Sequence, residues 1–245
     1  MERWIQITDI HIGRADEDTY GIDVRSNFQR SLAAARRLHP TRIVLTGDLC
    51  FREPEPEAYA WILGELQATG ISFTVLPGNH DSTEAVIEHF GAPGQLDDGT
   101  LGFALDLGAR RVLFLDTASS HLSQDGLAFL ADNLGRGDAS PIAFIHHPPL
   151  LGGVPFMDDN HALKNHPEVL DTLMAAKRHV SVFCGHYHVE RSVRRGLVDV
   201  FLTPSTFFQI SAETKGFSVD HQRPAIRWIE LDDADLRTGV KYLET

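Results

Sequence analysis

The chain has 245 residues, of which 42% are apolar and 23% are charged. These proportions are typical of a folded domain with a large core and argue against disorder. The 34 acidic residues outnumber the 22 lysines and arginines, and the resulting net charge of −12 disfavours binding of a nucleic acid polymer. Two cysteines, Cys50 and Cys184, are too few for a disulfide scaffold or a cysteine-rich zinc module.

Apolar runs alternate with amphipathic segments in the first third of the chain. Strands are predicted at residues 4–8, 42–46 and 72–76, and helices between them at residues 23–38 and 57–69. The order strand, helix, strand, helix, strand indicates a parallel sheet with right-handed crossovers.

The rest of the chain has a mixed pattern. Residues 101–107 and 111–116 flank Gly108 and predict a hairpin. Further helices are expected at residues 124–134 and 168–177, and further strands at residues 142–145, 180–184, 189–194, 197–202, 225–231 and 239–243. The last four strands are expected to be antiparallel. We therefore expect a single α/β domain over residues 1–245, with two packed sheets and helices outside them.

Two features of the sequence bear on the cellular compartment. The longest uncharged stretch, residues 141–157, contains four prolines and two histidines, which excludes a membrane-spanning helix there. Glu2, Asp9 and His11 interrupt the N-terminal segment, which is unlike a secretory signal peptide. We expect a cytoplasmic protein without a membrane partner.

Five polar clusters follow predicted strands, and each taken singly could be an ordinary turn or loop. They are Asp9-Ile10-His11, Gly47-Asp48, Gly78-Asn79-His80-Asp81, His146-His147-Pro148-Pro149 and Gly185-His186-Tyr187-His188. Strand ends of an open α/β sheet converge on one crevice. Imidazole and carboxylate groups suit first-row divalent metals. Together, the five clusters predict a metal site.

The order D-x-H, G-D, G-N-H-D, H-x-P and G-H-x-H resembles the calcineurin-like metallophosphoesterase superfamily, from Asp9 to His188. The resemblance implies a four-layer α/β/β/α sandwich of two mixed sheets and two divalent metal ions, which Asp48 would bridge. The implied ligands of one ion are Asp9, His11, Asp48 and His188, and those of the other are Asp48, Asn79, His146 and His186. His146 is preferred to His147 because the ligand in this family stands two residues before the first proline.

Further segments resemble the bacterial class III cyclic-nucleotide phosphodiesterases. They are residues 146–150, 159–165, 203–206, 209 and 227–231. Phe207 stands where many of those enzymes have cysteine. The resemblance implies hydrolysis of a small phosphodiester, first a 3′,5′-cyclic nucleotide such as cyclic AMP. The alternatives are a glycerophosphodiesterase or a phosphomonoesterase/diesterase of broad specificity. A scaffold without catalysis is disfavoured because every implied ligand position is kept.

The same resemblance implies a mechanism in which a hydroxide bridging two ions of Mn, Fe, Co or Zn attacks phosphorus in line. We expect His80 to contact a phosphate oxygen or to protonate the leaving oxygen, with Asp81 fixing its tautomer. Asn79, His147 and His161 are the other expected substrate contacts, although His147 could instead support the site and His161 could be an exposed loop histidine. A homodimer is left open.

Overall fold

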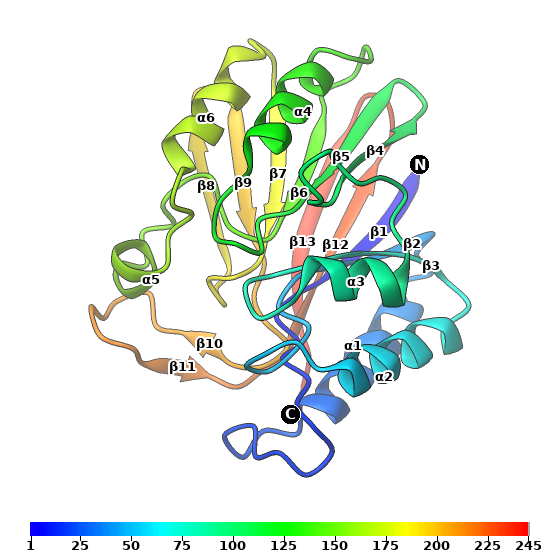
Figure 1. Cartoon of the computed structure of the whole chain (residues 1–245), viewed down its shortest axis with the longest axis vertical. Coiled ribbons are helices and arrows are strands. Elements are labelled where there is room, and N and C mark those ends of the chain that lie inside the picture. Colours follow the sequence, from blue (N-terminus) through cyan, green and yellow to red (C-terminus); the bar gives the residue numbers. More distant parts are fainter. Residues whose placement is uncertain (245) are drawn as a thin grey trace.

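The computed structural model describes residues 1–244, which form two β-sheets packed face to face (Figure 1). The strands of the first sheet are β1 (Glu2–Ile7), β2 (Arg42–Thr46), β3 (Ser72–Leu76), β12 (Ala225–Leu231) and β13 (Leu236–Tyr242). Those of the second are β4 (Gly102–Leu107), β5 (Arg110–Leu115), β6 (Ile142–Ile145), β7 (Val180–Cys184), β8 (Arg191–Arg195) and β9 (Val198–Leu202). The strand orders are β13-β12-β1-β2-β3 and β4-β5-β6-β7-β9-β8.

Both sheets are mixed, as the sequence predicts. Strands β1, β2 and β3 pair in parallel, and their crossovers are α1 (Val24–Arg36) and α2 (Pro56–Ala68). Strand β12 pairs antiparallel with both β1 and β13. The expected hairpin is the antiparallel pair β4–β5, whereas β5, β6, β7 and β9 follow one another in parallel. The ends of β1, β2, β6 and β7 therefore lie near one another in the sandwich.

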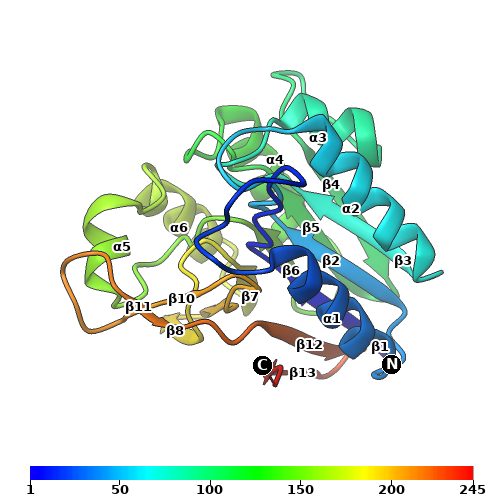
Figure 2. The same cartoon turned by 90° about the horizontal axis from the view of Figure 1, so that it is seen from below.

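Helices cover the outer faces of the sandwich, which completes the four layers (Figures 1 and 2). The first sheet is flanked by α1, α2 and α3 (Thr83–Phe90), and the second by α4 (Gln124–Leu134) and α6 (His166–Ala175). Within residues 1–244, no helix combines the length and the apolar character needed to cross a membrane.

Four short elements are absent from the sequence prediction. Helix α3 has only eight residues, and α5 (Pro155–Asn160) has six. A small hairpin of β10 (Gln209–Ile210) and β11 (Val219–His221) lies beside α5, away from the main layers (Figures 1 and 2). Such short elements carry too few residues for a periodic pattern to appear.

The core between the sheets is largely aromatic. Trp4 of β1 stacks on Phe114 and Phe144 of the second sheet, with ring centroids 6.2 and 6.0 Å apart. Ile5, the next residue along β1, belongs instead to the cluster that packs under the helices. This alternation follows from the two-residue period of a strand, since both faces of β1 are buried.

A buried polar residue joins the two sheets beside the strand ends. The Gln6 amide donates hydrogen bonds to Thr46 Oγ1 (2.8 Å) and to the carbonyl of Cys184 (3.2 Å). Thr203 Oγ1 donates to Gln6 Oε1 at 2.6 Å. Gln6 thereby ties β1 and β2 to β7 and β9 next to the loops that carry the polar clusters.

Candidate active site

The loops after β1 and β2 continue side by side beyond the sheet. The backbone N–H of Asp9 donates to the carbonyl of Gly47, and that of His11 to the carbonyl of Asp48, both at 3.0 Å. Asp9, His11 and Asp48 all have left-handed backbones, with φ of 53°, 47° and 50°. This conformation is uncommon outside glycine and is found at functional sites.

The loop after β7 shows the same backbone strain, at His186 (φ 67°) and His188 (φ 49°). Within residues 1–244, nine residues other than glycine have positive φ, and five of them belong to these polar clusters. A side chain at Gly185 would collide with Thr8, and its Cβ would lie 2.6 Å from Asp9 Oδ2. Glycine is therefore required where the β1 and β7 loops meet.

A first group of four side chains consists of Asp9, His11, Asp48 and His188, whose potential ligand atoms all lie within 4.8 Å of one another. His188 Nε2 lies 3.5 Å from Asp9 Oδ1 and 3.1 Å from His11 Nε2. Since His188 Nδ1 contacts the Phe208 carbonyl at 2.9 Å, its Nε2 is the nitrogen with the free lone pair in the neutral ring. The lone pair therefore faces the group.

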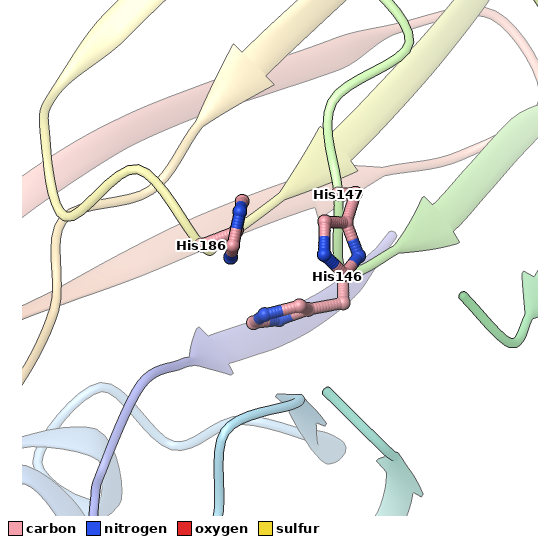
Figure 3. Close-up of side chains that lie close together, drawn as sticks. All are labelled: His146, His147 and His186. Atoms are coloured by element: carbon pink, nitrogen blue, oxygen red, sulfur yellow. The ribbon is translucent and has the colours of Figure 1, made fainter. Parts of the chain in front are cut away.

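A second group consists of His146, His147 and His186, whose rings converge near the ends of β6 and β7 (Figure 3). His146 Nδ1 lies 2.7 Å from the Thr46 carbonyl, and His186 Nε2 lies 2.8 Å from the carbonyl of His161. The opposite nitrogens, His146 Nε2 and His186 Nδ1, are buried without a hydrogen-bond partner in the described part of the chain. Buried imidazole nitrogens in this state suit metal coordination, and the carbonyls fix the tautomer.

Asp48 lies between the two groups. Its Oδ1 is 3.3 Å from His146 Nε2, and its Oδ2 is 3.8 Å from His11 Nε2. The buried atoms of both groups that could coordinate a metal are imidazole nitrogens or carboxylate oxygens, which fits first-row divalent cations. The residues present therefore fit a metal centre, and Asp48 is placed to contact both sides of it.

The pKa shifts of these side chains also fit a metal centre. Burial lowers the pKa of His11 to about 3 despite the nearby Asp48, and burial and His146 lower the pKa of His186 to about 3. For His146, burial also lowers the pKa, but the combined effects of Asp48, Asp9 and the Thr46 carbonyl outweigh burial and raise the pKa to about 9. Burial also opposes ionisation of Asp48, yet His146 holds the pKa of that carboxyl well below its usual value. The Asp48 carboxylate thus favours positive charge at this place.

Asn79 and His80 lie on the loop after β3, at the outer side of these groups. Asn79 is exposed and lines a cavity over the site, together with His80. The His80 backbone donates to Asp48 Oδ1 at 3.0 Å, and His80 Nε2 lies 4.0 Å from Asp48 Oδ2. The His80 ring therefore faces both Asp48 and the space where a substrate would lie.

Asp81 has a different role from the one that the sequence suggested. Its carboxylate accepts hydrogen bonds from the Leu49 backbone (3.0 Å) and from the Tyr59 hydroxyl (3.1 Å), which point it into the interior. The expected contact with His80 is wrong, because His80 Nδ1 instead lies 3.1 Å from the carbonyl of Arg52. Asp81 fastens the loop after β2 to the loop after β3. Burial and Asp48 raise its pKa to about 6.

The two histidines expected to contact the substrate lie in different surroundings. His147 is fully buried behind His186, with ring centroids 4.1 Å apart, and its Nδ1 lies 2.9 Å from Thr117 Oγ1. Its burial removes it from the cavity lining and places its Nε2 in the second group, so a substrate contact is not supported. His161 is exposed and lines the cavity, as the sequence suggested for the 151–165 insertion.

The cavity has a volume of about 390 Å³, within the range of small-molecule sites. Its floor includes His11, Asp48, His186 and His188. Its walls are mostly aromatic, and the rings are those of Tyr20, Phe51, Phe156, Phe207, Phe208 and Phe217. Of these six residues the sequence marks only Phe207 as unusual, because the other five belong to no common motif.

This α/β sandwich, with two adjacent groups of buried aspartate and histidine side chains at its strand ends, is typical of a metal-dependent phosphoesterase. Residues 3–190 match the family model described as calcineurin-like phosphoesterase. The chain belongs to the calcineurin-like phosphoesterase family, which confirms the resemblance read from the D-x-H to G-H-x-H motifs.

The similarity to known proteins extends over nearly the whole chain. A protein of Fibrobacter succinogenes named "probable cyclic nucleotide phosphodiesterase" is 33% identical, covering 98% of this chain and 93% of its own. The Escherichia coli protein named 3′,5′-cyclic adenosine monophosphate phosphodiesterase CpdA is 30% identical, covering 98% and 90%. A solved dimetal phosphatase from Danio rerio aligns with a TM-score of 0.69 at 13% identity, over 97% and 95% of the two chains. That last similarity shows the fold alone.

Proposed function

We propose that this chain hydrolyses a small phosphodiester and that its substrate is a 3′,5′-cyclic nucleotide such as cyclic AMP. The observation that carries this proposal is a cavity with a carboxylate–histidine floor and aromatic walls. A cyclic nucleotide has the matching parts, an anionic phosphodiester and a flat base. The printed names of the two similar bacterial proteins support the same substrate class.

The metal ligands in this proposal are the residues of the two groups except His147, with Asn79 added. Asp9, His11, Asp48 and His188 would hold one ion, and Asp48, Asn79, His146 and His186 the other. Mn, Fe, Co and Zn all suit such oxygen and nitrogen donors. When bound, two divalent ions would lower the pKa of a water so that it can attack phosphorus at neutral pH. They would also supply positive charge for the phosphoryl oxygens.

The remaining chemistry falls to side chains of the chain itself. His80 faces the cavity beside Asp48, and in our proposal it donates a hydrogen bond or a proton to the oxygen that leaves phosphorus. The carbonyls of Thr46, His161 and Phe208 hold three of the histidine rings in one tautomer and orientation. The aromatic walls exclude water, which strengthens the electrostatic interactions below them.

The test is a panel of hydrolysis assays on protein that is first stripped of metal with a chelator and then loaded with Mn²⁺. The panel comprises 3′,5′- and 2′,3′-cyclic nucleotides, glycerophosphoethanolamine, bis(p-nitrophenyl) phosphate and p-nitrophenyl phosphate. We expect the highest kcat/KM on a 3′,5′-cyclic nucleotide and no turnover after chelation. A glycerophosphodiester or a monoester as the best substrate would contradict the proposal. The Asp48→Asn variant, purified in parallel, controls for contaminating phosphodiesterases.

A further inference from the structure

We propose that Tyr20 and Phe217 form a subsite for the flat base of the substrate, over the ring of Phe208. This subsite would select nucleoside phosphates over aliphatic phosphate esters. The inference rests on the proposed function, because it concerns the part of the substrate that the metal centre does not hold.

The first observation is exposure at the mouth of the cavity. Tyr20 is 60% exposed and Phe217 is 55% exposed, although both line the cavity. The neighbouring Phe208 is almost completely buried. Large aromatic side chains left open beside a catalytic cavity can bury their faces only against something that enters it. The position of the two rings therefore points to a flat, apolar part of the ligand.

Tyr20 forms the outer end of a series of rings that leads down to the site. Its ring stacks on Phe207 at 6.0 Å with an angle of 14°, and it meets the edge of Phe51 at 5.3 Å. The Phe207 ring in turn lies 5.2 Å from that of His11.

Phe217 belongs to another part of the chain, the loop between β10 and β11. Its ring lies 5.6 Å from Phe156 of α5 and 5.7 Å from Phe208. Tyr20 contacts the same Phe208 ring at 6.5 Å, and Phe208 lies 5.0 Å from His188 on the cavity floor. Tyr20 and Phe217 thus both border Phe208, next to the proposed metal ligands.

The backbone at Tyr20 holds this arrangement in place. Tyr20 and Gly21 have φ of 56° and 71°, and the Ile22 N–H donates to the Thr19 carbonyl at 3.1 Å. Two successive left-handed residues are tolerated in such a tight turn, but for a bulky aromatic residue this conformation is unusual. Strain of this kind is retained at functional positions. In this protein, the left-handed backbone of Tyr20 accompanies the packing of its ring against Phe207.

Stacking on aromatic side chains accepts any nucleobase, since every base has a π face. Glycerol and ethanolamine groups have no flat face and would gain nothing from Tyr20 or Phe217. The subsite therefore predicts selection by the presence of a base, with the phosphate held equally in all substrates.

The experiment measures binding of 5′-AMP and of glycerol 3-phosphate to Mn²⁺-loaded protein by calorimetry, so that hydrolysis is not needed. We expect the wild type to prefer 5′-AMP by about tenfold or more. Tyr20→Ala should reduce that preference by about tenfold and Phe217→Ala by about threefold, whereas Tyr20→Phe should retain it. Val219→Ala is the matched control, because Val219 is exposed on β11 but does not line the cavity.

The ratio of the two affinities separates the outcomes. A general loss of metal or of folding lowers both affinities, and an unchanged ratio in Tyr20→Ala and Phe217→Ala would overturn the subsite. If the wild type hydrolyses cyclic AMP but the two variants keep its affinity ratio, the subsite is contradicted and the proposed function is not. Preference for 5′-AMP that depends on Tyr20, in a protein that turns over glycerophosphodiesters best, would support the subsite and contradict the proposed function.

Discussion

The floor of the cavity and the outer part of its walls are built in opposite ways. On the floor, Asp48 and His188 are buried, and the His188 ring is fixed by a backbone carbonyl. On the walls, Tyr20 and Phe217 are more than half exposed and are held by contacts between rings. A site on rigid strand ends keeps its geometry, whereas exposed loop residues can change without disturbing it. In our proposal, the floor determines the reaction and the walls determine the substrate.

The most severe change should be the loss of the carboxylate that both groups of the floor share. Asp48→Asn should reduce turnover by on the order of 10³-fold or more, because a divalent centre stabilises the transition state by several kcal/mol. Metal content and kcat measured on the same preparation check this. Asp116→Asn is the matched control, since Asp116 is a buried carboxylate outside both groups. Full metal content and near-normal kcat in Asp48→Asn would contradict the central position of Asp48.

His80 lies at the boundary between floor and walls, and its loss should affect rate rather than metal content. Removing a positioned acid or electrostatic stabiliser costs about 10²–10⁴-fold in rate. In His80→Ala, we expect a lower kcat with both ions retained. The loss should be larger for a diester with a poor alkoxide leaving group than for a nitrophenyl ester, whose phenolate leaves without protonation.

Equal losses on the two kinds of ester would indicate charge stabilisation at the phosphate instead of acid catalysis. An unchanged rate, or loss of metal, would remove His80 from the proposed mechanism. His89→Ala serves as the control, because the His89 ring packs within α3 against the Ala85 carbonyl and does not line the cavity.

A third prediction distinguishes the role of the exposed Asn79 in metal binding from that of the buried His147. Asn79→Ala should weaken one of the ions and lower turnover by about 10²-fold, whereas His147→Ala should cost about tenfold through the orientation of its neighbours. Metal titration of the two variants is the measurement. If His147→Ala lost an ion and Asn79→Ala or His146→Ala did not, the ligand set of the second group would have to be revised.

The smallest expected effect concerns a proton on the floor. In the metal-free protein, His146 has a pKa raised to about 9, so it is protonated near neutral pH. Because a metal needs the neutral ring, metal uptake at about pH 7 should release about one proton per chain from His146, in addition to any proton lost by metal-bound water, and the contribution of His146 should vanish well above pH 9. Calorimetry in two buffers of different ionisation enthalpy measures this release. Identical heats in the two buffers at about pH 7 would contradict it, and His146→Ala should reduce the difference by about one proton per chain.

The fold and most of the floor could be predicted from the sequence. Strand and helix periods are local, so β1 to β3 and their crossovers follow from short segments. The polar clusters are equally local, because each directly follows a strand, and parallel strand ends meet at one edge. For this reason the sequence alone predicts that the clusters carrying Asp9, Asp48 and His188 meet.

Only the tertiary structure decided which atoms face the site and what covers it. The carbonyls of Thr46 and Phe208 select the free nitrogens of His146 and His188, yet Thr46 is 100 residues from His146 in sequence. Tyr20 and Phe217 lie in separate loops and are brought together by their contacts with Phe208. Such contacts depend on side-chain packing between distant segments, which leaves no period or spacing in the sequence.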